Sequence, residues 1–403
     1  MSPLQHNLPF LQGHDVDRTR LQAELLDWMR AWERGDPVAE DRAGSRFEAL
    51  ALAVFRHQFN EIPAYWAFCL QRGATPEAVL VADDIPLVPV TAFKRAPLCN
   101  PGALAAPACV FETSGTSDGQ PGRVHLADTV LYDASLHATF QRFVVPDASR
   151  LSSRFRCISL VPAAETRPHS SLGYMVRQLT RRWDDGGGSE HLGSGTVRPD
   201  GTSLETLDIP GLERALGRAH AERRPVLLFA TSIAIALWLD RAANAVWPLP
   251  PGSRVMDTGG PKGRRIRVSR VEQLRRLSNT LQIEEEFIVG ELGMTELCSQ
   301  RYETTARSRL IGDVQGMRAY AAPPWLRTRV LRPADRSPAA LGEPGMLAHL
   351  DLANLDTCAF VLTADLGQVT PLPGHGTAIV IGGRIPGSEW RGCGLDAEDL
   401  ALG

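Results

Sequence analysis

The chain has 403 residues, of which 43% are hydrophobic and 22% are charged, with a formal net charge of −3 at pH 7. These values are ordinary for a globular protein of one or two domains. The small net charge gives no reason to expect nucleic acid or an anionic membrane as a partner. Seven cysteines form no C-x-x-C pair, so neither a zinc site nor a disulfide framework is predicted.

The location of the protein is predicted to be cytoplasmic. The first 17 residues lack the charged start and apolar centre of a signal peptide. The longest apolar stretch, residues 225–239, is too short to cross a bilayer. We therefore expect no membrane span.

Residues 1–80 are predicted to be a helical region packed on the core. Two groups of apolar residues recur at helical spacing, and the sequence GDP at 35–37 separates them. We interpret both groups as core packing rather than as a ligand site. They are Leu21, Leu25, Trp28, Met29 and Trp32, followed by Phe47, Leu50, Ala51, Val54 and Phe55.

The middle of the chain alternates between short apolar strands and amphipathic helices. Strands are predicted at 157–161, 226–230, 254–256 and 287–289, and helices at 129–143, 174–183, 212–223, 233–243 and 271–279. The Gly- and Ser-rich residues 184–195 are predicted to be a loop. The alternation predicts an α/β fold with layered, largely parallel sheets, in which ligands bind where loops leave the carboxyl ends of strands.

Beyond residue 311 the pattern changes to a β-rich subregion. Strands are predicted at 328–331, 346–351 and 359–363, separated by turns with Pro and Gly. The sequence TADLG at 363–367 is expected to end one strand, and residues 378–381 are expected to lead into the sequence GGR at 382–384.

The stretch 110–123, VFETSGTSDGQPGR, combines small hydroxyl residues with glycine. Glycine lets the backbone approach a ligand closely, and backbone N–H groups and hydroxyls can point together at one anion, such as a nucleotide phosphate. The stretch is neither a Gly-Lys-Ser/Thr loop nor a G-x-G-x-x-G fingerprint. Taken alone, it fits a Ser/Gly-rich surface loop equally well.

Other unusual loops follow the predicted strands: DTGGPKGR at 257–264 and ELGMTE at 291–296. A polar turn at 168–173 precedes a predicted helix. Each motif also has an ordinary structural interpretation. Asp365 could close a β-turn, Glu296 could be solvated, and Arg384 could pair with a surface acid.

Taken in order, these motifs match those of adenylate-forming enzymes, the superfamily of acyl-CoA synthetases and related ligases. Within it the chain resembles the acyl-protein synthetase (LuxE) family and, more distantly, the phenylacetate–CoA ligases. The resemblance runs from about residue 80 to the end, and six motifs in register make it fairly specific. They lie at 85–94, 171–175, 258–263, 291–300, 351–354 and 391–393.

The resemblance implies an adenylation core with the nucleotide site at 81–380, and a hinge with a short tail at 381–403. It implies that ATP and Mg²⁺ bind here, that Thr295 binds the α-phosphate and that Glu296 holds the metal. Asp365 would accept hydrogen bonds from the ribose hydroxyls, and Arg384 would lie beside the nucleotide. The other residues implied in nucleotide binding are Thr113, Ser114, Gly115, Thr116, Ser117, Gly293 and Met294.

Two departures from the superfamily pattern bear on catalysis. The glycine and lysine that end the phosphate loop in many relatives are replaced by Gly122 and Arg123. Typical members also continue for roughly another hundred residues, a small domain, into a lid that carries a catalytic lysine. We expect this lid to be missing or vestigial, so a cation of the main body must stabilise the charge at the α-phosphate. Lys262, one of two lysines in the chain, is the candidate, with Arg264 and Arg384 as substitutes.

The carboxylic acid substrate is expected to contact His169, Ser170, Gly173, Gly259 and Gly260. The sequence around this pocket favours an apolar acyl or aryl group. The resemblance implies transfer of the acyl group to a thiol, either Cys393 or a thiol of an acyl-carrier or reductase-like partner protein.

Three functions thus follow from the sequence. The first is ATP-dependent formation of an acyl-adenylate with transfer to a thiol. The second is a ligase that delivers the acyl group to CoA or an amine. The third is a non-catalytic adenylate-binding scaffold of an acyl-processing complex.

Overall fold

The structure is a computed structural model, and it describes residues 14–36, 43–113, 121–151, 154–187, 189–197, 203–242, 245–259, 269–313, 316–373 and 376–384. The side chains of residues 14–17, 43, 195–197, 203–205 and 384 are not described. Among the helices of the described ranges, none combines the length and the apolar character that crossing a membrane requires.

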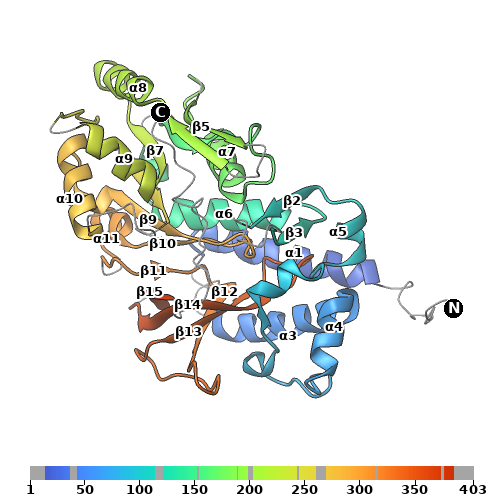
Figure 1. Cartoon of the computed structure of the whole chain (residues 1–403). Helices are drawn as coiled ribbons and strands as arrows, with labels where there is room; N and C mark the ends of the chain where they lie inside the picture. The colour runs from blue at the N-terminus through green and yellow to red at the C-terminus, as the bar shows by residue number, and fades with distance from the viewer. Residues whose placement is uncertain are drawn as a thin grey trace.

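Helices and strands alternate through most of this part of the chain (Figure 1). The helices are α1 His14–Glu33, α3 Ala43–Glu61, α4 Pro63–Leu70, α5 Pro101–Ala105, α6 Val130–Phe143, α7 Ser171–Trp183, α8 Ile209–Glu222, α9 Ser232–Ala242, α10 Arg270–Leu281 and α11 Thr305–Ile311. The strands are β1 Val88–Pro89, β2 Cys109–Glu112, β3 Arg123–Leu126, β4 Arg156–Pro162, β5 Glu190–Val197, β6 Ser203–Leu207, β7 Val226–Thr231, β8 Arg254–Thr258, β9 Ile288–Leu292, β10 Arg301–Glu303, β11 Tyr320–Ala321, β12 Leu326–Leu331, β13 Gly345–Asp351, β14 Phe360–Pro371 and β15 Thr377–Arg384.

Thirteen of these strands form one sheet in the order β12-β13-β14-β15-β11-β10-β9-β8-β7-β4-β5-β6, with β1 paired to β14 off this path. The strands β5, β4, β7, β8 and β9 are parallel neighbours, whereas the strands from β9 through β10, β11, β15, β14 and β13 to β12 pair antiparallel. The predicted α/β fold with a parallel core and a β-rich subregion is confirmed.

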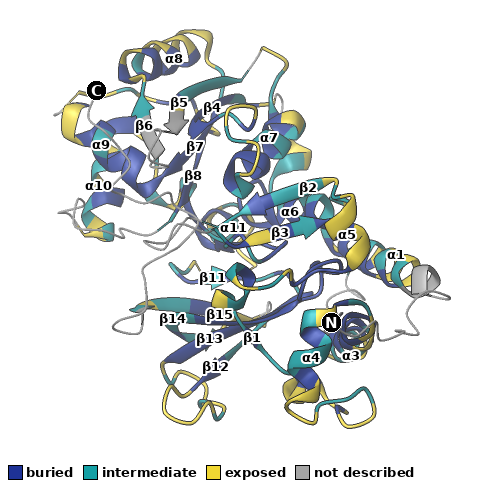
Figure 2. Cartoon of the chain, turned by 45° about the vertical axis from the view of Figure 1, so that its right-hand side comes forward, coloured by how far each residue is buried: buried dark blue, intermediate teal, exposed yellow. Residues whose placement is uncertain are grey.

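Helices cover both faces of the parallel strands, which explains their nearly continuous apolar sequences. Side chains of a strand alternate between its two faces. In β7, Val226 and Leu228 pack in a cluster with α8, α9 and α10, whereas Leu227 and Phe229 pack in the cluster that contains α6 and α7. Figure 2 shows these strands buried and the outer sides of α5 and α8 exposed.

The N-terminal helices join this main cluster, as their apolar spacing predicts. All ten apolar residues of the two predicted stripes are buried. On α3, the buried side chain of Gln58 forms hydrogen bonds with the backbone of residues 354–359. Its amide donates to the carbonyls of Asn354 and Thr357 at 2.6 and 2.7 Å, and its oxygen accepts from the backbone N–H of Ala359 at 2.9 Å.

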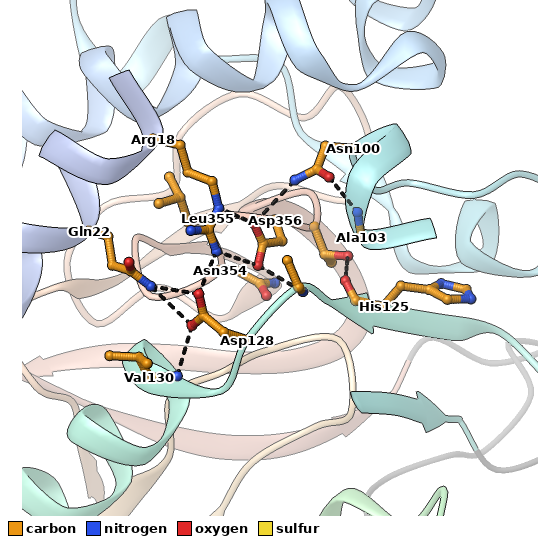
Figure 3. Close-up of polar contacts among 12 residues, drawn as sticks. Arg18, Gln22, Asn100, Ala103, His125, Asp128, Val130, Asn354, Leu355 and Asp356 are labelled. Carbon is orange, nitrogen blue, oxygen red and sulfur yellow. Dashed lines mark hydrogen bonds and ion pairs between the residues drawn. The ribbon is translucent and has the colours of Figure 1, made fainter. Parts of the chain in front are cut away.

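A polar network fixes α1 to two distant segments (Figure 3). Arg18 donates through Nε and Nη2 to the carboxylate of Asp356 at 2.7 and 2.9 Å, and through Nη2 to Asp128 at 2.9 Å. Asp356 also accepts from Asn100 at 3.1 Å and from the backbone N–H of Ala127 at 3.0 Å. Burial alone would raise the pKa of Asp128, but hydrogen bonds from Arg18, the Val130 N–H and Gln22 outweigh it and lower that pKa.

Three tryptophans also hold α1 against the rest of the fold. The ring of Trp325 meets those of Trp28 and Trp32 edge to face, with centroids 6.0 and 5.2 Å apart. The Trp325 indole N–H donates to Ser135 Oγ at 2.8 Å, and Ser135 in turn donates to Ser299 at 2.9 Å. The helix α1 is thus connected to the segment that follows β9.

Several sequence-based boundaries were wrong. Residues 190–195, predicted to be part of the loop at 184–195, belong to β5 at the edge of the parallel sheet, because β6 pairs with this strand and supplies hydrogen bonds that the weak local sequence does not indicate. The expected turn at 171–173 is the first turn of α7, which Ser170 caps by accepting from the Gly173 N–H at 3.0 Å. Asp365 lies inside the long strand β14 rather than at its end.

Candidate functional site

The carboxyl ends of β8 and β9 lie side by side in the parallel sheet, with Thr258 opposite Glu291 in register. The Thr258 hydroxyl donates to the Glu291 carboxyl. Gly259, which follows directly, has a left-handed backbone (φ +77°) that favours glycine. The Ser232 hydroxyl, at the start of α9, contacts the Gly259 carbonyl and lies 2.7 Å from the Asp257 carboxylate. The base of the loop after β8 is therefore held by side chains from two neighbouring elements.

Glu291 is the most unusual side chain in this region, since it is 3% exposed and carries an acidic group. Burial raises its pKa to about 7, and the hydrogen bond from Thr258 offsets only part of this rise. A Cβ atom added to Gly293 would lie 2.6 Å from Glu291 Oε1. Any larger residue at this position would therefore have to displace the carboxyl group of Glu291.

The hairpin of β2 and β3 carries the predicted phosphate loop. Thr113 and Gly122 close it with two hydrogen bonds of 2.9 Å, one from the Thr113 N–H to the Gly122 carbonyl and one from the Gly122 N–H to Thr113 Oγ1. The rings of Phe111, Tyr132 and Tyr174 pack at centroid distances of 5.3 to 5.5 Å beneath the hairpin. The ends of the loop are thereby fixed against α6 and α7.

His169 joins the hairpin to the start of α7. Its carbonyl accepts from the Glu112 N–H at 2.9 Å, and its Nδ1 lies 3.0 Å from the Val110 carbonyl. The next residues, Ser170 and Ser171, cap and begin the helix. His169 thus contacts the backbone of β2 in this structure.

The start of α7 lies beside the segment that follows β9. Ser171 Oγ is 3.2 Å from the hydroxyl of Thr295, a residue that is 8% exposed. The N-terminal end of a helix carries partial positive charge, so a negative group near Thr295 is favoured electrostatically. The structure therefore brings together the hairpin, the turn at 169–171 and Thr295, three of the predicted site segments.

Glu296 follows Thr295 and is held through its backbone. Its carbonyl accepts from Asn354 Nδ2 at 2.7 Å, and Asn354 Oδ1 lies 2.9 Å from the Cys298 sulfur. The carboxylate of Asp351 accepts from the N–H groups of Cys298 and Ser299, both at 2.8 Å. These contacts fix the 295–299 segment against the strand β13.

The described residues contain no group of three or more His, Cys, Asp or Glu side chains arranged to hold a metal ion.

Asp365 on β14 lies opposite Arg384 on β15 in the antiparallel register. Its N–H donates to Thr363 Oγ1 at 3.1 Å, and the register of the two strands shifts directly after Leu366. The motifs at 363–367 and 382–384 are thus neighbours, as their assignment to one nucleotide site requires.

Seven of the predicted site residues lie outside the described part of the chain. They are Ser114, Gly115, Thr116, Ser117, Gly260, Lys262 and Cys393. Their assignments remain predictions, as do the roles of the described site residues.

Sequence reasoning missed the Ser171–Thr295 contact and the Thr258–Glu291 pair. The signal for the second was present, since Glu291 comes two residues after the apolar run Phe287–Val289 and is followed by the apolar Leu292. It was missed because the strand was predicted to end at 289, which placed Glu291 in a solvated loop.

No protein-family model matches the chain. A long-chain-fatty-acid–luciferin-component ligase of Aliivibrio fischeri is 35% identical over 82 residues, which make up 19% of this chain and 22% of that protein. The match thus spans about a fifth of the relative's length.

Among solved structures, 2-hydroxyisobutyryl-CoA ligase in complex with 2-HIB-AMP and CoA superimposes with a TM-score of 0.60 at 15% identity, over 86% of this chain and 70% of that one. An open conformation of that ligase gives a TM-score of 0.58 at 14% identity, over 84% and 70% of the two chains. The chain therefore has the fold of the adenylate-forming ligases, and the predicted resemblance to the acyl-protein synthetases is confirmed over part of its sequence.

Proposed function

We propose that this protein uses ATP to activate a carboxylic acid and then transfers the acyl group to a thiol. The main support is the position of Thr295. Its hydroxyl lies 3.2 Å from Ser171 at the positive end of α7, at the edge of the sheet where the parallel strands end. A hydroxyl pair at a helix N-terminus suits a phosphate group.

In the first step, a carboxylate oxygen of the acid attacks the α-phosphorus of ATP. The bond from that phosphorus to the bridging oxygen breaks, which gives an acyl-adenylate and pyrophosphate. Thr295 would hold the α-phosphate, while the hairpin closed by Thr113 and Gly122 would hold the remaining phosphates. The protein would contribute mainly by positioning the reactants and neutralising charge.

Cations are required because the reacting groups are all anionic. Glu296 would hold Mg²⁺, which supplies positive charge to the phosphate oxygens when bound. Lys262 would stabilise the charge that develops at the α-phosphate. Asp365 and Arg384, paired across β14 and β15, would contact the ribose and the rest of the nucleotide.

In the second step, a thiolate attacks the acyl carbon, and the carbon–oxygen bond to AMP breaks. The thiol loses its proton, the acyl group becomes a thioester, and AMP leaves. The acceptor would be Cys393 or a thiol of an acyl-carrier or reductase-like partner. The glycines on both sides of Cys393 in the sequence would allow the backbone to deliver the thiol, and Arg391 would favour the thiolate form.

The first step is tested by ATP–pyrophosphate exchange over a panel of carboxylic acids. We expect exchange with at least one apolar or aryl acid, and loss of exchange in Thr295→Val. The matched control is Thr166→Val, since Thr166 is exposed and its hydroxyl bonds only to the local Ala163 carbonyl among the described residues. ATP binding without exchange for any acid would instead indicate an adenylate-binding scaffold.

The acceptor is tested by intact mass after incubation with ATP, Mg²⁺ and an accepted acid. A hydroxylamine-labile acyl adduct that is absent in Cys393→Ser would support the carrier role of that residue. An adduct unchanged in this variant, or acyl transfer only to added CoA, would contradict it and favour the CoA ligase alternative.

A further inference from the structure

One buried acid contacts both strand-end segments of the candidate site and has no role in the chemistry above. Glu291, near the end of β9, receives a hydrogen bond from Thr258 at the end of β8. Its other carboxyl oxygen lies against Gly293, in the segment that leads to Thr295. A single side chain thus supports the loop after β8 and the segment after β9.

Charged groups near this part of the sheet lie on its other face. The N–H of Gly290, the preceding residue, donates to the Glu303 carboxylate at 2.7 Å, and Arg318 donates to the same carboxylate at 2.7 Å. Arg270 pairs with Asp257, which alternates with Thr258 along β8. Because neighbouring residues of a strand point to opposite faces, these charges are separated from Glu291 by the sheet.

Among the described residues, Glu291 has neutral neighbours on its own face of the sheet. Tyr302, its register partner on β10, is buried, and its phenol has no hydrogen-bond partner in the described part of the chain. Burial, and then proximity to Glu291, raise the pKa of Tyr302, so this phenol stays neutral at physiological pH. Tyr320 on β11 pairs in register with Glu303 and therefore lies on the opposite face. Among the described residues no cation contacts the Glu291 carboxyl.

We propose that Glu291 is a positioning residue that joins the two strand-end segments in its neutral form, and that anion binding at those segments is coupled to uptake of a proton by Glu291. The inference rests on the proposed nucleotide site. It goes beyond that site because neither the resemblance nor the chemical steps give Glu291 a role.

The coupling follows from electrostatics. An ionised Glu291 would repel the phosphates of a nucleotide bound at Thr295, and Glu291 is buried, so the repulsion is weakly screened. Binding of an anion therefore favours the protonated acid. Since burial already raises the pKa of Glu291 to about 7, the group titrates near neutral pH. Linkage is reciprocal, so ionisation of Glu291 must weaken nucleotide binding by the same factor.

Calorimetry of ATP binding in two buffers of different ionisation enthalpy measures the protons taken up. With saturating Mg²⁺, the wild type should take up more protons near pH 7.5 than Glu291→Gln, in which the amide keeps the shape of the neutral acid. The protonation of ATP itself cancels in this difference. If binding raises the Glu291 pKa by about one, the affinity of the wild type should fall about tenfold more from low to high pH than that of the variant.

The melting temperature without nucleotide gives a second measurement. A glutamate with a raised pKa in the folded state favours folding when protonated. Its contribution is therefore lost as pH rises from the unfolded value near 4.5 to about 7, and it is constant above that. The wild type should lose stability relative to Glu291→Gln across this range. Glu272→Gln, an exposed acid on α10, is the control, and it should show no such change.

The outcomes separate this inference from the proposed function. Equal proton uptake by the wild type and Glu291→Gln, with ATP binding intact in both, would overturn the coupling and leave the nucleotide site standing. A difference in melting temperature that does not vary with pH would overturn it as well. Failure of the wild type to bind ATP would overturn both, and excess uptake that is lost in the variant supports the proposal.

Discussion

The buried contact between Arg18 and Asp356, which we call the Arg18–Asp356 junction, allows a quantitative prediction of stability. In Asp356→Ala, four hydrogen bonds to one buried carboxylate are lost, two from Arg18, one from Asn100 and one from the Ala127 N–H. Breaking a buried ion pair typically costs about 3–5 kcal/mol, because the remaining charge stays buried. Arg18 is 19% exposed and keeps Asp128 at 2.9 Å, so we expect the lower end, a loss of about 3 kcal/mol in the free energy of unfolding.

The measurement is urea unfolding followed by tryptophan fluorescence, with the free energy taken from the midpoint and slope. Asp356→Asn should lose less, because the amide oxygen can still accept from two of the donors. As a control, Glu284→Ala breaks an ion pair with Arg309 that is half exposed, and its effect should be much smaller. A loss below about 1 kcal/mol for Asp356→Ala would refute the view that this junction holds α1 on the core.

The remaining predictions concern the nucleotide site. Glu296→Gln should abolish Mg²⁺-dependent exchange in a protein that remains folded by circular dichroism, and near-normal exchange would remove Glu296 from the site. Asp365→Ala should weaken ATP binding by on the order of 2 kcal/mol, measured by calorimetry, through loss of charge-assisted bonds to the ribose, and an unchanged affinity would contradict that role. Lys262→Ala should lower the turnover of adenylation more than the affinity for ATP, because its charge matters most in the transition state. Poor binding with normal turnover at saturation would indicate a ground-state role instead.

The sequence alone predicted the parallel core because buried parallel strands are continuous apolar runs, without alternating polar residues. The strands at 157–161 and 226–230 were found for this reason, and each lies within the observed β4 and β7. Edge strands give no such signal. Strand β5 contains Gly193, Ser194 and Gly195, and it is a strand because it pairs with β4 and β6 rather than because its sequence prefers one.

The sequence indicated which elements carry the motifs but not the contacts between those elements. It placed Thr295 after the strand observed as β9 and Asp365 in the β-rich half of the sheet, although Asp365 lies within β14 rather than at a strand end, and the roles of both residues remain predictions. The contact of Ser171 with Thr295 joins residues 124 positions apart, and no local pattern encodes it. The buried state of Glu291 likewise depends on β10, a strand of three residues that was not predicted.

The cluster of Trp28, Trp32 and Trp325 provides an intrinsic spectroscopic signal for the docking of α1 on the rest of the fold. Trp28 and Trp32 come from the first helix, and Trp325 comes from the segment before β12, so their rings meet only when α1 is docked against that segment. Indoles held edge to face in an asymmetric setting give near-ultraviolet circular dichroism, a signal that disappears when tertiary packing loosens even if helices remain. The contribution of these three indoles to the near-ultraviolet spectrum therefore follows the docking of α1 separately from helix content, without any label attached to the chain.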